Sequence, residues 1–377
     1  MSIRRRTGRG ARDELKIKAA LSNGAAAPFE ITEVELDEPR PDEVLVRLTA
    51  AGVCHTDLTM KAAWPAELSP IVLGHEGAGV VEAIGAQVAG VRPGDHVLLS
   101  YRSCRSCAEC AAGHPTYCRE FLTLNATGAR PDGSTTMHQD GSPVYGSFFG
   151  QSSFASHALA YEPNLVVVGD HVDLSIAAPL GCGVQTGAGA VLNVLRPGGA
   201  ASLVLFGVGA VGLSAVMAAA ATGVATIIAV DPVASRRQVA AELGATATID
   251  PAADDVVDAI RQLTGTGATH ALDTTASGAV INQAIDALAP LGTLALVGVG
   301  MPEVEINVQA VIGGGKTIRG IIEGDAVPQT FLPQLLDLHA NGRLPIEKLI
   351  RTYDFDDIET AVADAASGST IKPVLVF

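Results

Sequence analysis

Four cysteines lie close together in the sequence and indicate a metal site. The segment CRSCAECAAGHPTYC holds Cys104, Cys107, Cys110 and Cys118. Four thiolates at such short spacing are typical of a closed, structural zinc site. Two disulfides or unpaired buried thiols are the alternatives, but disulfides belong to oxidising compartments. The basic N-terminus, MSIRRRTGRGAR, lacks the apolar segment of a secretory signal, so we expect a cytoplasmic protein. We therefore expect the four cysteines to bind zinc rather than to form disulfides.

The two remaining cysteines, Cys54 and Cys182, are far apart, and His75 stands between them in the chain. Two thiolates and an imidazole would form a three-ligand zinc site whose fourth position stays open for substrate or water. Ligands this distant leave no local pattern, so their spacing alone does not decide whether the three side chains meet. We interpret the cysteines as ligands of two zinc ions per subunit, one structural and one catalytic.

A glycine-rich segment, Gly207-Val-Gly-Ala-Val-Gly212, has the pattern G-x-G-x-x-G. It follows a predicted strand, Ser202–Phe206, and precedes a predicted helix, Leu213–Thr222, which is the context that a dinucleotide site requires. Gly207 allows the tight turn, Gly209 lets the backbone approach a pyrophosphate, and Gly212 lets helix and strand pack closely. The N-terminus of the helix offers free N–H groups to the phosphates.

Asp231 ends the next predicted strand, Thr226–Val230. A carboxylate at this place accepts hydrogen bonds from the adenosine ribose and repels a 2′-phosphate, so we predict NAD rather than NADP. Arg236 and Arg237 follow closely and could weaken that preference.

Composition excludes other classes of function. The chain has 377 residues, of which 48% are hydrophobic and 17% charged, and its formal net charge is −15. We expect no nucleic-acid partner, because a nucleic-acid surface needs a basic face. The uncharged stretch from Pro197 to Val230 is long enough to span a bilayer, but glycines interrupt it. We interpret it as strand, turn, helix and strand, and we expect no membrane partner.

The pattern along the chain divides it into two parts. Residues 16–182 are expected to form short strands and turns, with a long loop, Ala111–Tyr145, around the cysteine cluster. From about Gly183 strands and helices alternate, which indicates a doubly wound parallel sheet. The further predicted elements are helices at Ala234–Leu243, Asp254–Leu263, Ala279–Ala289, Thr330–Ala340 and Ile358–Ala366 and strands at Lys16–Ala20, Phe29–Glu35, Val44–Ala50, Val80–Ile84, Ala247–Ile249, Ala268–Asp273, Thr293–Val299 and Lys372–Phe377.

Taken together, these motifs resemble the zinc-dependent medium-chain alcohol dehydrogenases over nearly the whole chain. The resemblance is carried by AGVCHTD, GHEGAGVVEAIG, PGDHV, the four-cysteine loop, GCGVQTGAGAVLN and FGVGAVG. The segments EGDAVPQTFLPQLL and IKPVLVF are most similar to the aryl-alcohol (benzyl-alcohol) branch, which includes allylic-alcohol enzymes.

The resemblance implies an α/β fold with a GroES-like, β-rich catalytic domain and a doubly wound Rossmann domain that binds NAD. Residues 1–15 would be a disordered basic tail, residues 16–183 and 322–377 the catalytic domain, and residues 184–321 the Rossmann domain. A small-molecule alcohol or aldehyde would be the substrate. The subunits would form a homodimer or homotetramer, often through an edge strand such as Val304–Val308.

The resemblance also assigns roles to single residues. Cys54, His75 and Cys182 would hold the catalytic zinc, Asp57 would orient His75, and Glu76 would sit behind the metal. Thr56 would take the alcohol proton, and His55 would lie near the pyrophosphate or the ribose. The residues expected to contact the cofactor are Thr186, Val211, Val299, Arg236 and Lys372, in addition to Asp231 and the three glycines.

Several points stay open at this stage. Many relatives end the proton relay in a histidine where this chain has Thr59, so the relay would end at His55 or in water. Trp64, Phe148 and Phe149 would wall an apolar substrate pocket or belong to the plain core. A thiol-adduct formaldehyde dehydrogenase, a general aliphatic alcohol dehydrogenase and a zinc-ribbon nucleic-acid binder are the alternatives. The thiol-adduct enzyme would use Arg102, Arg105 and Arg119 at the pocket mouth.

Overall fold

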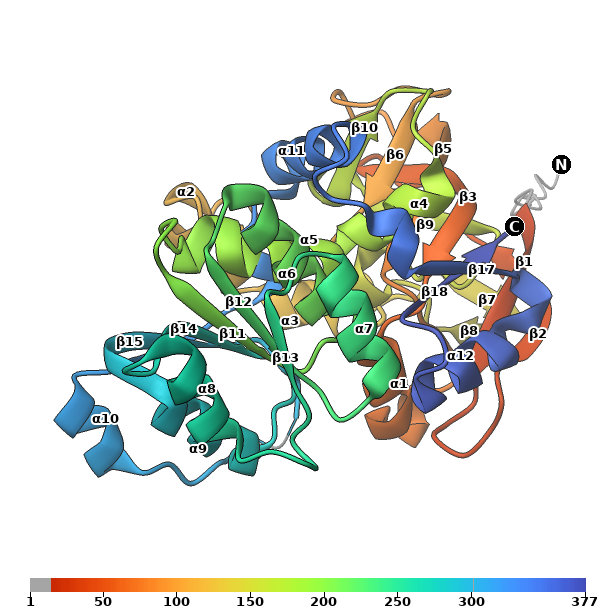
Figure 1. Cartoon of the computed structure of the whole chain (residues 1–377). Helices are drawn as coiled ribbons and strands as arrows, with labels where there is room; N and C mark the ends of the chain where they lie inside the picture. Colours follow the sequence, from red (N-terminus) through yellow and green to blue (C-terminus); the bar gives the residue numbers. More distant parts are fainter. Residues whose placement is uncertain (1–14, 301) are drawn as a thin grey trace, which may run out of the picture.

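The computed structural model describes residues 15–300 and 302–377, so the predicted basic tail lies outside the described residues apart from Leu15, which begins strand β1. The fold is α/β, as expected. Figure 1 shows two lobes side by side, with helices α5 (Gly183–Gly189) and α6 (Ala210–Thr222) in the middle of the molecule.

The first lobe is built from two β-sheets. One has the order β4-β1-β2-β7-β8, and the other has the order β10-β6-β5-β3-β18-β17, with β9 also paired to β3. Their strands are β1 (Leu15–Ser22), β2 (Glu30–Leu36), β3 (Glu43–Gly52), β4 (Ile71–Val72), β5 (Glu76–Ile84), β6 (His96–Leu99), β7 (Met137–Gln139), β8 (Ser142–Val144), β9 (His157–Tyr161), β10 (Leu165–Val168), β17 (Ile350–Asp354) and β18 (Lys372–Val376). Strand β18 pairs antiparallel with β3, so segments from opposite ends of the chain share one sheet.

The second lobe is a six-stranded parallel sheet in the order β13-β12-β11-β14-β15-β16. Its strands are β11 (Ser202–Phe206), β12 (Thr226–Val230), β13 (Ala247–Ile249), β14 (Ala268–Asp273), β15 (Leu288–Leu296) and β16 (Thr317–Gly320). In sequence order this is 3-2-1-4-5-6, the Rossmann arrangement, whose ligand crevice lies between the first and fourth strands. The residues of β11 are all buried, as expected for a parallel strand covered on both faces.

The helices connect and cover these sheets. Besides α5 and α6, the α-helices of five or more residues in the described chain are α1 (His55–Ala63), α3 (Phe121–Asn125), α7 (Ala234–Glu242), α8 (Val256–Thr264), α9 (Gly278–Ala287), α10 (Val308–Gly314), α11 (Pro328–Ala340) and α12 (Ile358–Ser367), and a π-helical segment, Ala190–Leu195, follows α5. Short helical turns that matter for the site are η3 (Phe148–Gly150) and η7 (Glu323–Asp325). Helices α5 and α6 pack so closely that a Cβ on Gly187 would lie 2.0 Å from the carbonyl oxygen of Val211.

The strand, glycine turn, helix and strand expected between Pro197 and Val230 are confirmed as β11, α6 and β12. Other boundaries differ. The region Ala111–Tyr145 is more structured than a loop, because it contains α3 and the β7–β8 hairpin. Strand β15 spans Leu288–Leu296 rather than Thr293–Val299. Residues 304–307 form no strand, and α10 begins at Val308, since an edge strand there would need a neighbour to pair with.

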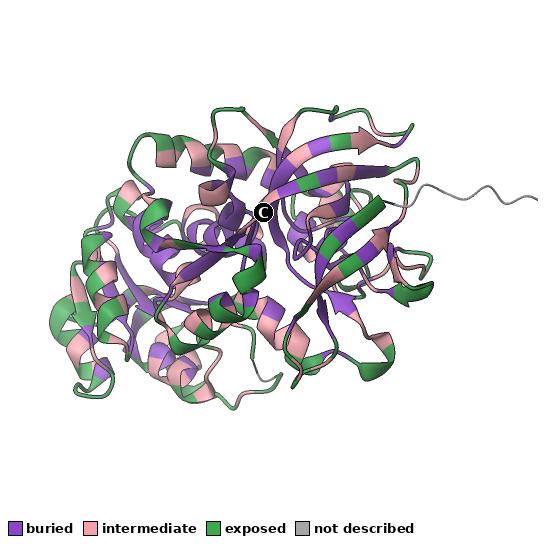
Figure 2. Cartoon of the chain, turned by 90° about the vertical axis from the view of Figure 1, so that its right-hand side faces the viewer, coloured by how far each residue is buried: buried purple, intermediate pink, exposed green. Residues whose placement is uncertain are grey.

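Buried side chains follow the sheets and the helices between the lobes. Figure 2 shows them concentrated along the strands, with exposed residues on the outer turns and helix faces. The largest hydrophobic cluster joins α5 and α6 to strand β11 and to the strand β18, through residues such as Val184, Leu213, Leu203 and Val374. This shared core packs the second lobe directly against the sheet that carries the predicted ligands.

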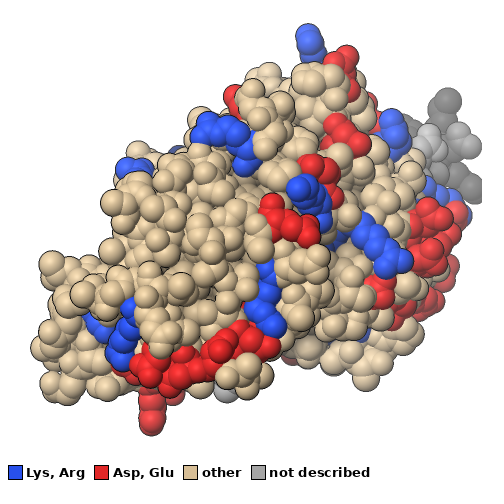
Figure 3. Space-filling view, viewed as in Figure 1, with Lys and Arg blue, Asp and Glu red and all other residues tan. Residues whose placement is uncertain are grey.

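The described part of the chain holds no single helix that is long and apolar enough to cross a membrane, although the bent helix pair Leu174–Gly181 and Gly183–Leu195 passes that test jointly. On the face shown in Figure 3, Lys and Arg side chains lie scattered, and acidic side chains stand next to several of them.

Candidate active site

The fold brings four predicted residues of the catalytic site into one cluster. Cys54 precedes α1, His75 lies directly before β5, Glu76 begins β5, and Cys182 precedes α5. One ligand atom from each of these four residues lies within 4.8 Å of the others. The ligands that sequence spacing could not connect are therefore joined by the packing of α1, β5 and α5.

Asp57 fixes the orientation of His75. Its Oδ1 lies 2.7 Å from His75 Nδ1 and also accepts a hydrogen bond from the backbone N–H of Gly74, at 3.1 Å. Its Oδ2 accepts from the backbone N–H of Cys54, at 3.0 Å. Asp57 and His75 are fully buried, and one carboxylate thus ties two ligand segments together.

The donor set fits a zinc ion. With Nδ1 taken by Asp57, the remaining ring nitrogen of His75, Nε2, is buried and has no hydrogen-bond partner within the described residues. It stands beside two sulfurs, and a hydrogen bond from Cys182 together with the charge of Lys372 lowers the pKa of the Cys54 thiol, against the opposing effect of burial. Zinc binds neutral imidazole and thiolate in this combination, with a carboxylate behind the imidazole.

Glu76 and Lys372 form a buried ion pair behind these ligands. Lys372 Nζ lies 2.9 Å from both carboxylate oxygens of Glu76 and 3.2 Å from the carbonyl oxygen of Val53. Burial raises the pKa of Glu76 to about 7, although Lys372 opposes this. Lys372 was expected to contact the cofactor, and in the structure its ammonium group faces Glu76.

Two aromatic rings pack against the imidazole of His75. The ring centroid of Phe149 lies 4.6 Å from that of His75, and the centroid of Phe148 lies 5.7 Å away. Phe149 has a left-handed backbone (φ 52°), which is costly for a bulky residue and is found where the surroundings enforce it. Trp64, the third predicted aromatic, is buried and donates its indole N–H to the carbonyl oxygen of Leu68, at 2.8 Å.

The predicted relay residues lie on the first turns of α1. Thr56 and Thr59 are half-buried, and His55 is exposed. The helix begins immediately after Cys54, so its first turn projects from the ligand cluster. The roles of Thr56 and His55 stay predictions.

The four clustered cysteines converge as a second group. Their sulfurs lie within 4.8 Å of one another, and all six cysteines of the chain are free of disulfides. The sulfurs of Cys104 and Cys110 are 3.9 Å apart, far longer than the 2.05 Å of a disulfide bond. Backbone N–H groups of Cys104 and Cys107 donate to the sulfurs of Cys118 and Cys104, both at 3.3 Å, as expected around thiolate ligands.

The glycine turn lies between β11 and α6. Gly207 has φ +85°, and a Cβ there would lie 2.4 Å from Thr274 Oγ1. A Cβ on Gly212 would lie 2.1 Å from the carbonyl oxygen of Gly207. Nothing lies within 4 Å of the corresponding position at Gly209, so that glycine faces open space where a pyrophosphate could approach.

Asp231 follows β12 and is held at the glycine turn. Its carboxylate accepts from the backbone N–H groups of Val208 and Val233, at 2.9 and 2.8 Å. Arg236 Nη1 lies 3.9 Å from the carboxylate. Arg237 donates to the backbone carbonyl oxygen of Asp231, at 2.6 Å, and pairs with Asp250, at 2.7 Å. Of the other predicted cofactor residues, Thr186 on α5 is buried, Val211 on α6 is half-buried, and Val299 is 59% exposed.

The structure adds residues that sequence reasoning missed. Glu323 is buried with its carboxylate 3.4 Å from the sulfur of Cys182, and Gln185 donates to it at 2.8 Å. Gln151 donates to the carbonyl oxygen of His75, at 2.9 Å, and accepts from the N–H of Gly77, at 3.0 Å. Only Glu323 had a sequence signal, the EGD motif, and that motif suggested a branch of the family rather than a role.

Both halves of the chain match known families. Residues 40–170 match the alcohol dehydrogenase GroES-like domain, and residues 210–341 match the zinc-binding dehydrogenase domain. The geraniol dehydrogenase of Castellaniella defragrans is 46% identical over 97% of this chain and 99% of its own length. The chain belongs to the zinc-dependent alcohol dehydrogenases. The predicted family is thereby confirmed.

Two solved structures of this dehydrogenase family agree with the fold over nearly the whole chain. The alcohol dehydrogenase zinc-binding domain protein from Burkholderia ambifaria is 50% identical, has a TM-score of 0.94, and is matched over 97% of this chain and 100% of its own. The benzyl alcohol dehydrogenase from Acinetobacter calcoaceticus is 42% identical, with a TM-score of 0.92 and coverage of 96% and 99%.

Proposed function

We propose that this alcohol dehydrogenase uses NAD and two zinc ions per subunit to oxidise primary aryl or allylic alcohols reversibly to aldehydes. The observation that carries the substrate class is the packing of two aromatic rings, Phe148 and Phe149, against the imidazole of His75. The names of the relatives, geraniol and benzyl alcohol dehydrogenase, support the same class of alcohol.

In this proposal, Cys54, His75 and Cys182 hold the catalytic zinc and the four-cysteine group holds the structural one. When bound, zinc lowers the pKa of an alcohol oxygen and NAD accepts the hydride. Asp57 keeps His75 Nδ1 engaged so that Nε2 faces the cluster.

Other side chains of the chain would position the reactants and move the proton. The hydroxyl oxygen of Thr56 accepts the alcohol proton and passes it to His55 or to water, because Thr59 cannot end the relay. Phe148 and Phe149 hold the apolar part of the substrate and keep water away from it. A buried aromatic ring removes on the order of 100 Å² of apolar surface from water, worth roughly 2–3 kcal/mol.

The choice of NAD rests on Asp231. Its buried carboxylate repels a 2′-phosphate, and Arg237, one of the two arginines that could have offset this, is engaged with Asp250. Thr186, Val211 and Val299 would complete the cofactor contacts. Lys372 would act on the cofactor only by giving up part of its contact with Glu76.

We further propose the division into a catalytic domain (16–183 and 322–377) and a cofactor domain (184–321), and self-association of the latter. Strand β16 ends the parallel sheet with an open edge. Nearby Leu291, Val308 and Ile312 expose 80%, 54% and 66% of their surface, which is unusual for large apolar side chains. A homodimer or homotetramer would cover this edge.

The thiol-adduct alternative has less support. Its three arginines are engaged within the chain: Arg102 lies 3.3 Å over the ring of Tyr161, Arg105 donates to Pro163, and Arg119 pairs with Glu109 at 2.9 Å. A screen of NAD reduction with benzyl, cinnamyl, allylic terpene, hexyl and ethyl alcohols tests the proposal. Formaldehyde with and without added thiol tests the alternative. If ethanol or hexanol matches benzyl alcohol in kcat/KM, the aryl and allylic assignment is wrong.

A further inference from the structure

A strained turn, Glu323-Gly324-Asp325, lies between the two cysteine groups. Its three residues have φ values of 49°, 67° and 49°. Three left-handed residues in succession are costly when two of them carry a Cβ, and such strain persists only where the surroundings impose it. The middle residue must be glycine, because a Cβ on Gly324 would lie 2.3 Å from the carbonyl oxygen of Gln185.

The first residue of the turn reaches the catalytic cluster. Glu323 Oε1 lies 3.4 Å from Cys182 Sγ, and its Oε2 accepts from Gln185 Nε2, at 2.8 Å. The same amide nitrogen, which carries two hydrogens, also lies 2.7 Å from the carbonyl oxygen of Gly181 and 2.8 Å from Ser100 Oγ. In the first of these contacts the Cys182 thiol is the donor, and a zinc-bound cysteine has lost that proton. The connection that persists in the loaded enzyme therefore runs from Glu323 through the Gln185 amide to the carbonyl oxygen of Gly181, the residue before Cys182.

The last residue of the turn reaches the four-cysteine loop. Asp325 Oδ1 lies 2.8 Å from His114 Nδ1 and accepts from Thr116 Oγ1, at 3.4 Å. Both partners stand between Cys110 and Cys118 in the chain. The other oxygen of Asp325 pairs with Arg319 Nη2, at 3.2 Å.

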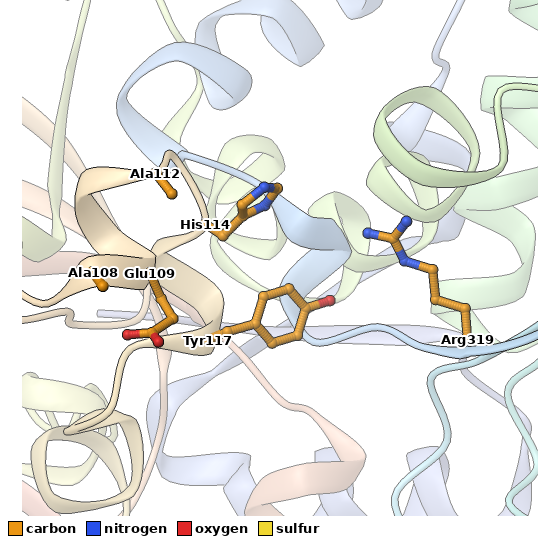
Figure 4. A pocket seen from close by; sticks show the side chains of 6 residues that line it. All are labelled: Ala108, Glu109, Ala112, His114, Tyr117 and Arg319. Atoms are coloured by element: carbon orange, nitrogen blue, oxygen red, sulfur yellow. The ribbon is translucent and has the colours of Figure 1, made fainter.

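Figure 4 shows a pocket whose lining includes His114 and Arg319, two partners of Asp325. His114 and Tyr117 project from the cysteine loop on one side of an open depression of about 470 Å³, and Arg319 extends toward it from the other side. Two more hydrogen bonds hold the turn and the residue after it: Tyr101 Oη donates to the carbonyl oxygen of Ala326, at 2.5 Å, and Asn193 Nδ2 donates to that of Gly324, at 3.0 Å.

We propose that Glu323 is a positioning residue for the catalytic zinc ligand Cys182, and that Asp325 fixes the turn to the four-cysteine loop. The strained turn then connects the two sites, so that the conformation of the four-cysteine loop determines the position of Cys182. The proposal rests on the proposed function only in naming the Cys54, His75 and Cys182 group as the catalytic metal site.

The test uses the zinc-loaded enzyme and four variants. Glu323→Gln keeps the shape of the side chain and removes its charge. Glu323→Asp keeps the charge but withdraws it from Cys182, and aspartate enters left-handed backbone more readily than glutamate. Asp325→Asn weakens the contacts with the cysteine loop without changing the backbone preference. Asp140→Asn is the matched control, because Asp140 is also left-handed (φ 49°) and lies exposed in the β7–β8 hairpin.

Two measurements are independent of turnover. One is the rate at which zinc passes to a coloured chelator such as 4-(2-pyridylazo)resorcinol. The other is the thiolate-to-metal charge-transfer band of enzyme with cobalt in the catalytic site and zinc in the four-cysteine site. Thermal unfolding of each variant shows that it is folded.

We expect the two Glu323 variants to release catalytic-site zinc about 10–100-fold faster and to shift the cobalt band, since groups that orient a ligand contribute this much. Asp325→Asn should change the zinc-release rate and the cobalt band in the same direction but by less, although Asp325 contacts no catalytic ligand. Asp140→Asn should match wild type in both measurements. Wild-type release and spectrum in Glu323→Asp would overturn the positioning role, even if Glu323→Gln failed to fold. If Asp325→Asn and Asp140→Asn gave the same zinc-release rate and the same cobalt spectrum, the proposed connection between the turn and the four-cysteine loop would be overturned.

Failure of the proposed function looks different. It would appear as poor oxidation of alcohols by wild-type enzyme, whereas failure of this inference would leave wild-type activity intact and the variants unchanged in metal release.

Discussion

The ammonium group of Lys372 lies 2.9 Å from both carboxylate oxygens of Glu76, in a pair whose side chains are almost completely buried. Glu76 also accepts from the N–H of Gly183, at 3.0 Å, so this carboxylate joins the start of β18 to the start of α5. The negative charge of Glu76 is thereby placed beside the sulfurs of Cys54 and Cys182, and the ammonium group of Lys372 neutralises it.

Lys372→Met should destabilise the protein strongly, because it leaves Glu76 as an unpaired buried charge. Breaking a buried pair by removing one partner costs about 3–5 kcal/mol. Lys16→Met, in an exposed pair with Glu33, is the control and should have little effect. Urea unfolding of both variants makes the comparison, and equal midpoints would contradict it.

Elemental analysis of purified protein should give close to two zinc per chain. Cys104→Ser should lower the melting temperature, since a closed four-thiolate site contributes to folding. Cys54→Ser should abolish alcohol oxidation and leave the fold largely intact. An enzyme that keeps its activity after complete removal of metal would contradict the proposed chemistry.

Asp231→Ser should weaken the use of NAD and improve the use of NADP, because it removes the ribose acceptor and the charge that repels a 2′-phosphate. Steady-state kcat/KM with each cofactor measures the effect. Equal efficiency of wild-type enzyme with both would mean that Arg236, 3.9 Å away, outweighs the carboxylate.

Phe149→Ala should lower the ratio of kcat/KM for benzyl alcohol to that for ethanol by about tenfold or more, the range expected for a contact in an apolar pocket. Phe331→Ala removes a buried ring from α11 and serves as the control. It should lose stability and keep the ratio. A fall in the ratio for both variants alike would point to general loosening of the core.

Arg130→Met should destabilise the protein by about 3–5 kcal/mol near neutral pH. Arg130 is 1% exposed and pairs with Glu43 and Asp37, each at 2.6 Å. Burial raises the pKa of Glu43, but hydrogen bonds from Arg130, from the backbone N–H of Arg40 and from Tyr161, together with the charge of Arg130, lower the net pKa below the ordinary value of 4.5. The unfolded chain then takes up this proton first, and the free energy of unfolding falls as pH drops below about 4.5. Acid titration of unfolding should be less steep in the variant.

Local patterns predicted the parts of the molecule that depend on neighbours in sequence. The glycine turn at Gly207 and the convergence of Cys104 with Cys118 need only a few residues, and both could be read directly. The meeting of Cys54 with Cys182 depends on how β5, α1 and α5 pack, which spacing does not encode. The resemblance to a family supplied it instead.

The remaining features have no sequence pattern at all. The resemblance placed Lys372 at the cofactor. Its partner in the structure, Glu76, is brought near only by the pairing of β18 with β3, which no local sequence pattern predicts. The role of Glu323 depends on a left-handed turn of non-glycine residues, which residue type does not predict. The strand expected at Val304–Val308 from the resemblance is absent, because residues 304–307 precede α10, which begins at Val308, and pair with no strand of the described chain.

The pairing of β18 with β3 also has a consequence for biosynthesis. Lys372 is translated 296 residues after Glu76, which at about 5–20 residues per second means a delay on the order of 15–60 s. During that time the carboxylate of Glu76 has no positively charged partner in the nascent chain. The sheet of the first lobe that contains β3 also lacks strand β18. Ribosome-bound chains stopped before residue 372 should therefore be sensitive to protease in the first lobe and dependent on chaperones, while the parallel sheet already folds.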